Sequence, residues 1–432
     1  MGNQGYPRRG NFSVKMLPAA MRLFWLPILK LAYSSRLSWD RDAYLEANPD
    51  VASALLENRI SSSWAHFACN GVFEGRKWWS DSRVPRFQGS GSSRYCLDPW
   101  AYLEISASGR VRPCCNYHDL EDLTSGDPAA SSVRDAESFV RLRESLLHGD
   151  LSHRCRTCHI RSALPPEQLQ AVIRTALHRP MGDIAKAGPL RSVRVDINER
   201  CNLRCIYCAS SQPGYSGVEM SEEVFTCCER FISVQEGRIT IVLNGHGETT
   251  FHPRWVEYFD RLARFGHRMA LVSNFAKRFD NAELDALARF DLIEVSLDSA
   301  NEDLMRRIRR HVSVSTITRN IEAVRTQAAR LGIREPKISF STGIYHPVVW
   351  ELEEFADFAA ALKARSVTFW NLRQYKPPEG ASIEVTSLNR LEASRKIKAT
   401  AVLRRLREKL SASGIPFVFF GDFHDESGTP LL

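Results

Sequence analysis

Short apolar runs alternate with longer segments of helical periodicity between residues 191 and 375. Strands separated by helices in this way are typical of βα units and a parallel sheet. We therefore predict an α/β domain in which six βα units form a partial (β/α)6 barrel of the TIM type, with functional residues at the carboxyl ends of the strands. The predicted strands are Ser192–Ile197, Ile239–Asn244, Met269–Ser273, Leu292–Leu297, Ile338–Gly343 and Val367–Asn371.

The segments outside this barrel follow other patterns. At 432 residues the chain exceeds one ordinary hydrophobic core, so several domains are expected. We predict an N-terminal basic and apolar segment at 1–37, a small helical module at 38–80, a linker rich in Ser, Gly, Arg and Pro at 81–94, a Cys-rich α+β module at 95–165, a connector at 166–190, the core barrel at 191–375, and a C-terminal helix and strand at 376–432.

The apolar run at residues 16–33 allows three interpretations. A membrane span needs about 20 mostly apolar residues, and this run is shorter and is broken by Arg22, Lys30 and two prolines. A signal peptide would start with Arg8 and Arg9, but the charges inside the run disfavour it. The third interpretation is an amphipathic segment, in which residues 16–33 either pack on the protein body or make peripheral contact with a membrane.

Composition excludes disorder, because 44% of the residues are hydrophobic. The net charge of +8 is a modest bias that favours anionic ligands, and no basic tract interleaved with aromatic residues indicates nucleic-acid binding. The 11 cysteines are grouped, which favours metal ligation over a disulfide framework and predicts a cytoplasmic location.

The most informative motif is Cys-Asn-Leu-Arg-Cys-Ile-Tyr-Cys at residues 201–208. Cys201, Cys205 and Cys208 can hold one iron–sulfur cluster, and three protein ligands leave one iron of a [4Fe–4S] cluster open to a small molecule. A zinc site or buried free thiols are the alternatives. Zinc sites usually pair two C-x2-C hooks, whereas this loop offers three unevenly spaced cysteines.

This C-x3-C-x2-C spacing, with an aromatic residue before the third cysteine, resembles the radical S-adenosylmethionine (SAM) superfamily. The resemblance implies that the open iron chelates SAM, which is cleaved reductively to give a 5′-deoxyadenosyl radical that abstracts hydrogen from a substrate. The cofactors implied are the [4Fe–4S] cluster and SAM, with Tyr207 beside them.

Other strand ends carry further motifs of the same family. The turn Asn244-Gly-His-Gly-Glu resembles the G-x-G-E-P segment, so Gly245, Gly247 and Glu248 are implied SAM contacts, although Thr249 replaces the proline. The pair Ser273 and Asn274 resembles S/T-N-G, in which the polar side chain reaches the SAM ribose, with Phe275 replacing the glycine. The pair Ser296 and Asp298 resembles S-x-D, another polar contact near SAM. Turn capping is the alternative role for both pairs.

A second group of cysteines precedes the barrel. A turn around Gly109 predicts a hairpin that brings Cys96 toward Cys114, and Cys155 and Cys158 form a C-x2-C hook. The order resembles the twitch or SPASM-type modules of radical SAM enzymes, which implies an auxiliary [4Fe–4S] cluster with Cys114 or Cys115 as one ligand. Structural zinc is the alternative.

Cys155-Arg-Thr-Cys158-His159 also satisfies the haem-attachment pattern C-x-x-C-H. Haem attachment would require export and would leave Cys96 and Cys114 without a role, so we disfavour it.

We therefore predict a radical SAM oxidoreductase that abstracts hydrogen from a peptide, protein or carbohydrate-type substrate. A small electron donor such as a flavodoxin or ferredoxin is the implied partner. The alternative is a non-catalytic iron–sulfur or zinc-binding scaffold on a degenerate barrel. His246 and His252 flank Glu248, and nothing in their spacing makes either one a catalytic base.

Overall fold

The structure is a computed structural model that describes residues 44–45, 48–56, 60, 63–66, 93–115, 117, 121–123, 131–148, 155, 158, 162–164, 185–372 and 385–420. The chain divides into two compact units. The first comprises Met1–Leu97, Arg143–Asp150 and Ser162–Gly188, and the second comprises Asp98–Leu142, Leu151–Arg161 and Pro189–Leu432. The predicted segment 16–33, His159 and most of 38–94 lie outside the described residues.

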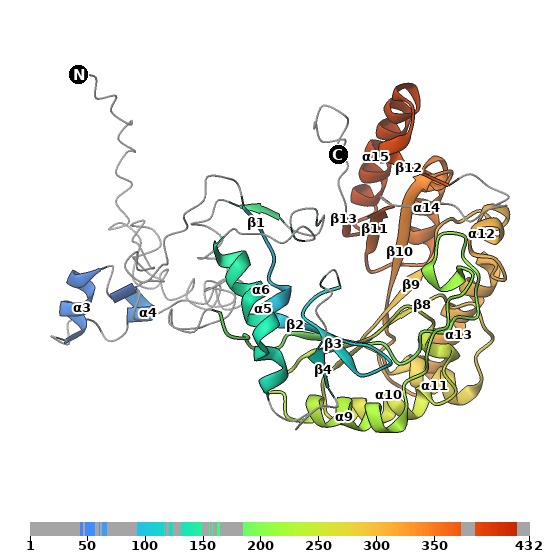
Figure 1. The fold of residues 1–432 in the computed structure, drawn as a ribbon. Coiled ribbons are helices and arrows are strands. Elements are labelled where there is room, and N and C mark those ends of the chain that lie inside the picture. Colours follow the sequence, from blue (N-terminus) through green and yellow to red (C-terminus); the bar gives the residue numbers. More distant parts are fainter. Residues whose placement is uncertain are drawn as a thin grey trace, which may run out of the picture. The chain divides into compact units, whose positions relative to one another are not determined.

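The second unit is built on one open sheet with the strand order β13-β11-β10-β9-β8-β7-β6-β2-β3-β4 (Figure 1). The strands from β13 to β2 are mutually parallel, and β3 and β4 continue the edge in antiparallel pairing. Their bounds are β2 Tyr102–Ile105, β3 Arg110–Arg112, β4 Glu121–Asp122, β6 Ser192–Val195, β7 Thr240–Leu243, β8 Arg268–Ser273, β9 Leu292–Ser296, β10 Lys337–His346, β11 Val367–Asn371 and β13 Phe417–Phe420; β12, Thr386–Ser387, pairs with β10.

The six predicted strands correspond to β6 through β11, in sequence order and all parallel. Most bounds agree within two residues, and β10 continues to His346. The sheet is wider than the predicted (β/α)6 arrangement, because β2 pairs in parallel with β6, and β13 pairs in parallel with β11. The fold is therefore α/β with an open parallel sheet, as predicted, but with an additional parallel strand at each end of the six.

The strand β2 comes from the segment expected to form a separate Cys-rich module. It joins β3 through the predicted hairpin, in which Gly109 has a φ of 79°. Leu103 and Ile105 are buried with Val193 and Val195 of β6 in one core. The strands β2, β3 and β4 of the predicted Cys-rich module therefore belong to the same sheet as the predicted barrel.

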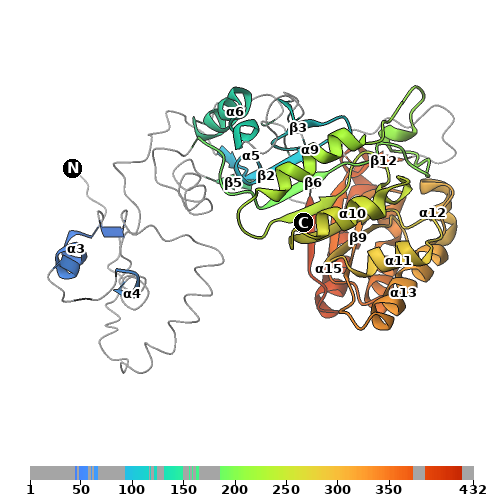
Figure 2. The ribbon, with the colours of Figure 1, turned by 90° about the horizontal axis from the view of Figure 1, so that it is seen from below.

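Helices lie along the outer side of this sheet (Figures 1 and 2). In α10, the buried residues Trp255, Tyr258, Phe259 and Leu262 recur at the spacing of one helix face, which packs inward. The helices and 3-10 turns are α5 Asp98–Ala101, η3 Ser131–Asp135, α6 Glu137–His148, η5 Ala209–Ser211, α9 Glu222–Ser233, η6 Thr249–Phe251, α10 Trp255–Ala263, α11 Asn281–Ala288, α12 Glu302–Arg309, α13 Val314–Arg330, η7 Val348–Glu351, α14 Leu352–Ala361, η8 Leu388–Arg390 and α15 Ala393–Ala412.

The described part of the first unit is small. It contains α3 (Pro49–Leu56), α4 (Ser63–His66), the antiparallel pair of β1 (Ser93–Tyr95) and β5 (Ser162–Leu164), and the end of α6. Tyr44 is fully buried, and its hydroxyl lies 2.9 Å from Nδ1 of His66. Among the described helices, none is both long and apolar enough to cross a membrane.

Candidate functional site

The three-cysteine loop follows β6 and lies at the carboxyl edge of the sheet. Cys205 is buried, whereas Cys201 and Cys208 are half-buried. Burial is the main cause that raises the pKa of the Cys201 thiol to about 11 and that of Cys205 to about 12. Leu203 N donates to Cys201 Sγ at 3.4 Å, and Nδ2 of Asn274 donates to the same sulfur at 3.7 Å. Donors directed at a sulfur suit a thiolate ligand.

Backbone contacts join this loop to the neighbouring turn after β7. A Cβ on Gly247 would lie 2.3 Å from the carbonyl oxygen of Arg200, and a Cβ on Gly245 would lie 1.7 Å from the Asp196 carboxylate. Glu248 N donates to Arg200 O at 2.9 Å, and Asn198 Nδ2 donates to Glu248 O at 2.9 Å. The glycines of the G-x-G-E turn are therefore needed for close approach to the segment before the cysteines.

Glu248 links this turn to the end of β8. Its side chain is buried, and Oε1 accepts hydrogen bonds from Thr250 N, Thr250 Oγ1 and Ser273 Oγ. Oε2 accepts a bond of 2.8 Å from Asn274 N. The carboxylate thus fastens two strand ends together in addition to any role toward SAM, which stays a prediction.

The end of β8 has a strained turn where the family motif has glycine. Phe275 has a φ of 52° and is fully buried. Asn320 of α13 donates to the carbonyl oxygens of Phe275 and Lys277 at 2.9 and 2.8 Å. These bonds hold the turn in a conformation that a non-glycine residue seldom adopts, so the departure from the motif is compensated locally.

Asp298, just beyond β9, is the centre of a buried polar group. Its Oδ2 accepts bonds of 2.6 Å from both the Tyr207 hydroxyl and Nε of Arg309, and its Oδ1 accepts from Gly343 N at 3.2 Å. Burial and Asp298 raise the pKa of Tyr207, against the opposing charge of Arg309. Asp298 therefore holds the cysteine loop through Tyr207. Ser296 lies half-buried at the end of β9.

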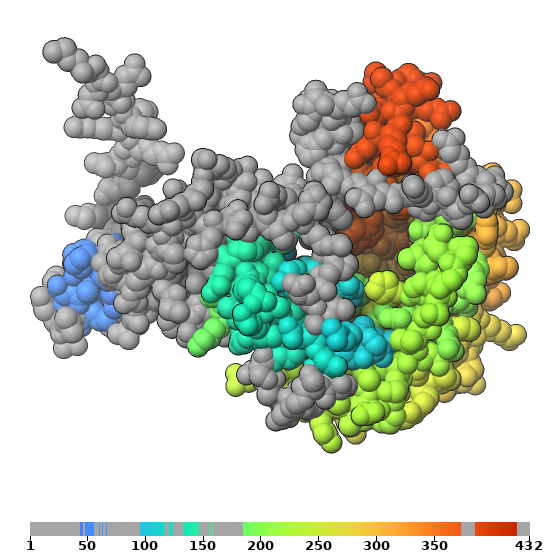
Figure 3. Space-filling model, in the orientation of Figure 1, coloured from blue at the N-terminus to red at the C-terminus, as the bar shows by residue number. Residues whose placement is uncertain are grey.

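A cavity of about 720 Å³ opens beside the loop and lies within the size range of ligand sites. Figure 3 shows the part of the chain that carries β2 to β4 (cyan) side by side with green segments that follow it in the sequence. The residues that line the cavity are Glu199, Arg200, Cys201, Asn202, Arg204, Ser210, Tyr215, Ser216, Gly217, Phe251 and His311.

Four of the five predicted auxiliary cysteines belong to the second unit. Cys114 and Cys115 follow β3, and Cys158 N donates to Cys155 O at 3.4 Å, which forms the turn of the C-x2-C hook. Burial, with Glu104, Asp98 and Cys158 adding to it and Arg194 opposing, raises the pKa of the Cys115 thiol. Cys96 follows β1 in the first unit.

The sequence did not single out two residues of this site. Asp196 follows β6 and is 1% exposed, with its Oδ2 2.9 Å from His246 N and 3.4 Å from His246 Nδ1. Arg309 is one of three arginines on α12, and only the structure distinguishes it as the buried partner of Asp298. A polar residue at the end of a strand was the available signal for Asp196.

Residues 195–359 match the family described as the Radical SAM superfamily. Among curated proteins, the chain is 28% identical over 171 residues to a probable GTP 3′,8-cyclase of Methanothermobacter thermautotrophicus, covering 39% of this chain and 54% of the relative. It is 31% identical over 139 residues to a probable GTP 3′,8-cyclase of Methanopyrus kandleri, covering 31% and 43%. The chain thus spans about half the length of the curated relatives it matches.

Among solved structures, SuiB of Streptococcus suis bound to S-adenosylmethionine has a TM-score of 0.42 and 15% identity, covering 74% of this chain and 71% of that chain. Native anSMEcpe with bound AdoMet has a TM-score of 0.41 and 16% identity, covering 53% and 63%. The family match spans the cysteine loop and five of the predicted strands, and it leaves out residues 95–165.

Proposed function

Residues 195–359 of this chain form a radical SAM domain, and on that premise we propose that the chain reductively cleaves SAM at a [4Fe–4S] cluster held by Cys201, Cys205 and Cys208. The observation that carries the proposal is the position of the three thiols. They lie in one loop that is bonded to the ends of β7, β8 and β9, with the cavity of about 720 Å³ beside Cys201.

The residues of the site fit such a group. The cluster, when bound, supplies one electron to SAM, and three protein ligands leave an iron open for the amino and carboxylate groups of SAM. The chain itself orients the ligands, through the bond of Asn274 to Cys201 and that of Asp298 to Tyr207. Gly245, Gly247, Glu248, Ser273 and Asn274 are the proposed contacts of SAM, together with Tyr207, Ser296 and Asp298.

Anaerobically reconstituted protein with a strong reductant should convert SAM into 5′-deoxyadenosine and methionine. The variant with Cys201→Ala, Cys205→Ala and Cys208→Ala should not. Cys227→Ala is a matched control, because Cys227 is a half-buried cysteine that packs against the core outside the loop. Equal turnover by the triple variant would overturn the proposal, and absence of SAM cleavage by the wild type would favour the non-catalytic scaffold.

The substrate proposed is a peptide, protein or carbohydrate-type molecule that gives up hydrogen to the 5′-deoxyadenosyl radical. The relatives are described as GTP 3′,8-cyclases, and GTP carries a ribose, so GTP is the first carbohydrate-type probe. Addition of GTP should raise the yield of 5′-deoxyadenosine, with loss of GTP measured by chromatography. A rise with GTP but not with a mixture of unstructured peptides would select the carbohydrate class, and the reverse result would select the peptide class.

A one-electron donor such as a flavodoxin or ferredoxin is part of the proposal, because SAM cleavage consumes an electron. The ten cysteines of the described residues are all free of disulfides, which supports a reducing, cytoplasmic setting. The exchange of the chemical reductant for reduced flavodoxin should preserve SAM cleavage.

We also infer a second metal site at Cys96, Cys155, Cys158 and either Cys114 or Cys115, with an auxiliary [4Fe–4S] cluster as the occupant. Cys114 and Cys115 both follow β3, so either one is a candidate for the fourth ligand. Protein that lacks the three loop cysteines should still carry about four irons. In that background, the further changes Cys155→Ala and Cys158→Ala should remove the iron. Zinc in place of iron would refute the redox role and leave a structural site.

A further inference from the structure

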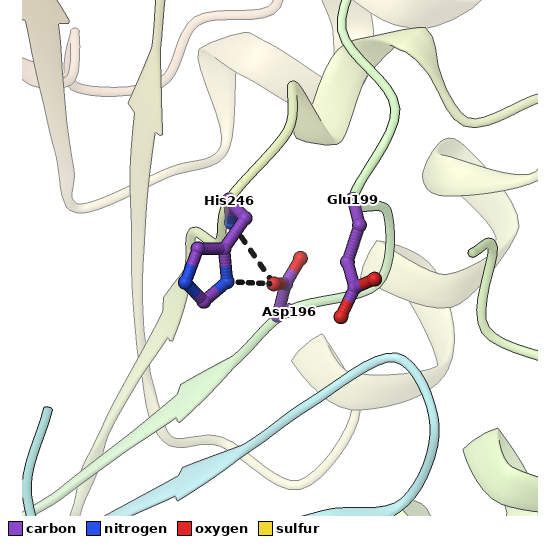
Figure 4. Close-up of side chains that lie close together, drawn as sticks. All are labelled: Asp196, Glu199 and His246. Carbon is purple, nitrogen blue, oxygen red and sulfur yellow. Dashed lines mark hydrogen bonds and ion pairs between the residues drawn. The ribbon is translucent and has the colours of Figure 1, made fainter. Parts of the chain in front are cut away.

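Asp196 is a buried carboxylate whose bonds place it against His246 (Figure 4). Its Oδ2 accepts a bond of 2.9 Å from His246 N and lies 3.4 Å from Nδ1 of the same residue. Its Oδ1 accepts from Asn198 N at 3.3 Å. Because Gly245 has no side chain, the turn after β7 can approach this carboxylate. Asp196 therefore has a fixed position from which it orients the imidazole.

His246 has one constrained nitrogen and one open nitrogen. With Nδ1 directed at Asp196, the neutral ring carries its proton on Nδ1 and a lone pair on Nε2. Nε2 points away from Asp196, and it has no hydrogen-bond partner among the described residues (Figure 4). The side chain is 47% exposed, so this nitrogen can reach a ligand. A carboxylate that orients a histidine in this way is a common arrangement for proton transfer.

His252, the other histidine of the same turn, is arranged differently. It is 4% exposed, and its Nδ1 accepts a bond of 3.1 Å from Arg254 N. Its ring lies 5.1 Å from that of Tyr258 between centroids. His252 is therefore a packed structural residue, and the tertiary structure separates two histidines that the sequence left equivalent.

The pair Asp196 and His246 lies next to the cavity beside the cysteine loop. Ligand atoms of Asp196, Glu199 and His246 lie within 4.8 Å of one another, and Glu199 lines the cavity with Cys201 and Tyr215. Burial raises the pKa of Tyr215 to about 12, with further contributions from Glu199, Asp196, Cys208 and Cys201. The cavity therefore has Glu199 of the acidic group and Cys201 of the cysteine loop in one wall.

We propose that His246, oriented by Asp196, is an acid–base residue that accepts a proton at Nε2 from an O–H or N–H group of a substrate bound at this cavity. This inference rests on the proposed function for its substrate. In the step, the substrate's O–H or N–H bond breaks, its electron pair stays on the oxygen or nitrogen, and the proton forms a new bond to Nε2. No electron is gained or lost, and the reverse step returns the proton.

The charges that act on His246 determine the pH at which it can accept a proton. The hydrogen bond to Asp196 is the largest influence and raises the pKa of His246, whereas burial and Arg112 oppose it and Glu104 adds to it. Glu199 faces the same ring. Because the raised pKa keeps the ring protonated to higher pH, acceptance of a proton becomes more effective as pH rises through that value. Removal of the Asp196 charge shifts that change to lower pH.

Acylation of the reconstituted protein by diethyl pyrocarbonate, which reacts with neutral imidazole, tests the geometry without a substrate. Mass spectrometry of the protein digest would measure the rate of His246 acylation at each pH. The midpoint of this pH dependence is expected above the ordinary histidine pKa of about 6.5. Asp196→Asn should shift the midpoint to lower pH, and its amide oxygen retains an acceptor for His246 N. Glu199→Gln removes a nearby negative charge as a matched control and should shift the midpoint less.

Three results would overturn the proposal. The first is a His246 that does not react, and the second is an identical midpoint in the wild type and Asp196→Asn. The third is complete protection of His246 from acylation by one equivalent of Zn²⁺, abolished in Glu199→Gln, since Asp196, Glu199 and His246 would then form a metal site. With GTP as the substrate probe, the pH at which GTP consumption rises should also shift lower in Asp196→Asn, and an unmoved rise would count against the proposal. Absence of GTP consumption would count only against GTP in the proposed function, and acylation would decide the role of His246.

Discussion

Nδ2 of Asn274 lies 3.7 Å from Sγ of Cys201 and 2.9 Å from Oδ1 of Asn202, so the end of β8 donates hydrogen bonds directly to the cysteine loop. The resemblance implied that this residue reaches the SAM ribose. The structure shows that the Asn274 amide contacts Cys201, a predicted iron ligand. A contact with the ribose would be a second role of the same amide. Hydrogen bonds to ligand sulfurs are among the influences that set the reduction potential of a cluster.

Replacement of Asn274 should therefore make the reduction potential of the cluster more negative. Asn274→Ala removes the donor without adding charge, and Asn274→Asp keeps an acceptor for the bond of 2.9 Å from Ala276 N. Potentiometric titration followed by electron paramagnetic resonance measures the change. Potentials equal to the wild type in both variants, at equal iron content, would exclude a direct influence of Asn274 on the cluster.

Glu248→Ala should destabilise the protein as well as weaken SAM binding. The change leaves the buried donors of Thr250, Ser273 and Asn274 without their acceptor, and each such loss costs about 1–3 kcal/mol. We expect a decrease of at least about 2 kcal/mol in the free energy of unfolding, measured with urea. Glu236→Ala, at an exposed glutamate before β7, is the control. A stability equal to that of the control would show that the network contributes little.

The buried pair of Asp298 and Arg309 should be more sensitive to loss of the arginine than of the neighbouring tyrosine hydroxyl. Arg309→Ala leaves a 1% exposed carboxylate without its cation, which typically costs about 3–5 kcal/mol. Tyr207→Phe removes one bond of 2.6 Å, and Asp298 keeps Arg309 and Gly343 N as donors. The ranking is measurable by denaturant unfolding with iron content as a second readout, and the reverse order would contradict it.

His252 should make the folded state sensitive to acid. Burial lowers the pKa of His252, with Arg254 adding to this effect, so the unfolded chain binds a proton more readily than the folded chain. Stability is therefore retained above the ordinary value of about 6.5 and decreases as pH falls below it. Protonation of Nδ1 would also remove the acceptor for Arg254 N.

The variant His252→Asn offers an oxygen acceptor near the position of Nδ1 and does not titrate. Denaturant unfolding between pH 7.5 and pH 5.5, a range that brackets about 6.5, should show a smaller decrease in stability for this variant than for the wild type. Equal decreases in both proteins would assign the acid sensitivity to other groups.

The sequence by itself determined the strands of the sheet and the three-cysteine loop. Alternation of apolar runs with helical segments was sufficient to locate β6 to β11, because buried apolar residues recur at least at every second position of these strands. The loop could be found because its cysteines are neighbours in the chain, so their spacing is visible without the fold. The resemblance in these residues agrees with the family match over residues 195–359.

Only the tertiary structure decided which distant residues meet. The parallel pairing of β2 with β6 joins residues about 90 positions apart, and no local pattern encodes the register of Glu104 with Arg194. Asp196 and His246 lie 50 positions apart in the sequence. Asp298 follows β9 and Arg309 is the last residue of α12, and the packing of this helix brings the two side chains together. Spacing along the chain reports contacts within a loop or helix, whereas contacts between strand ends depend on how the whole sheet is assembled, which is why the roles of Asp196 and Arg309 emerged from the fold.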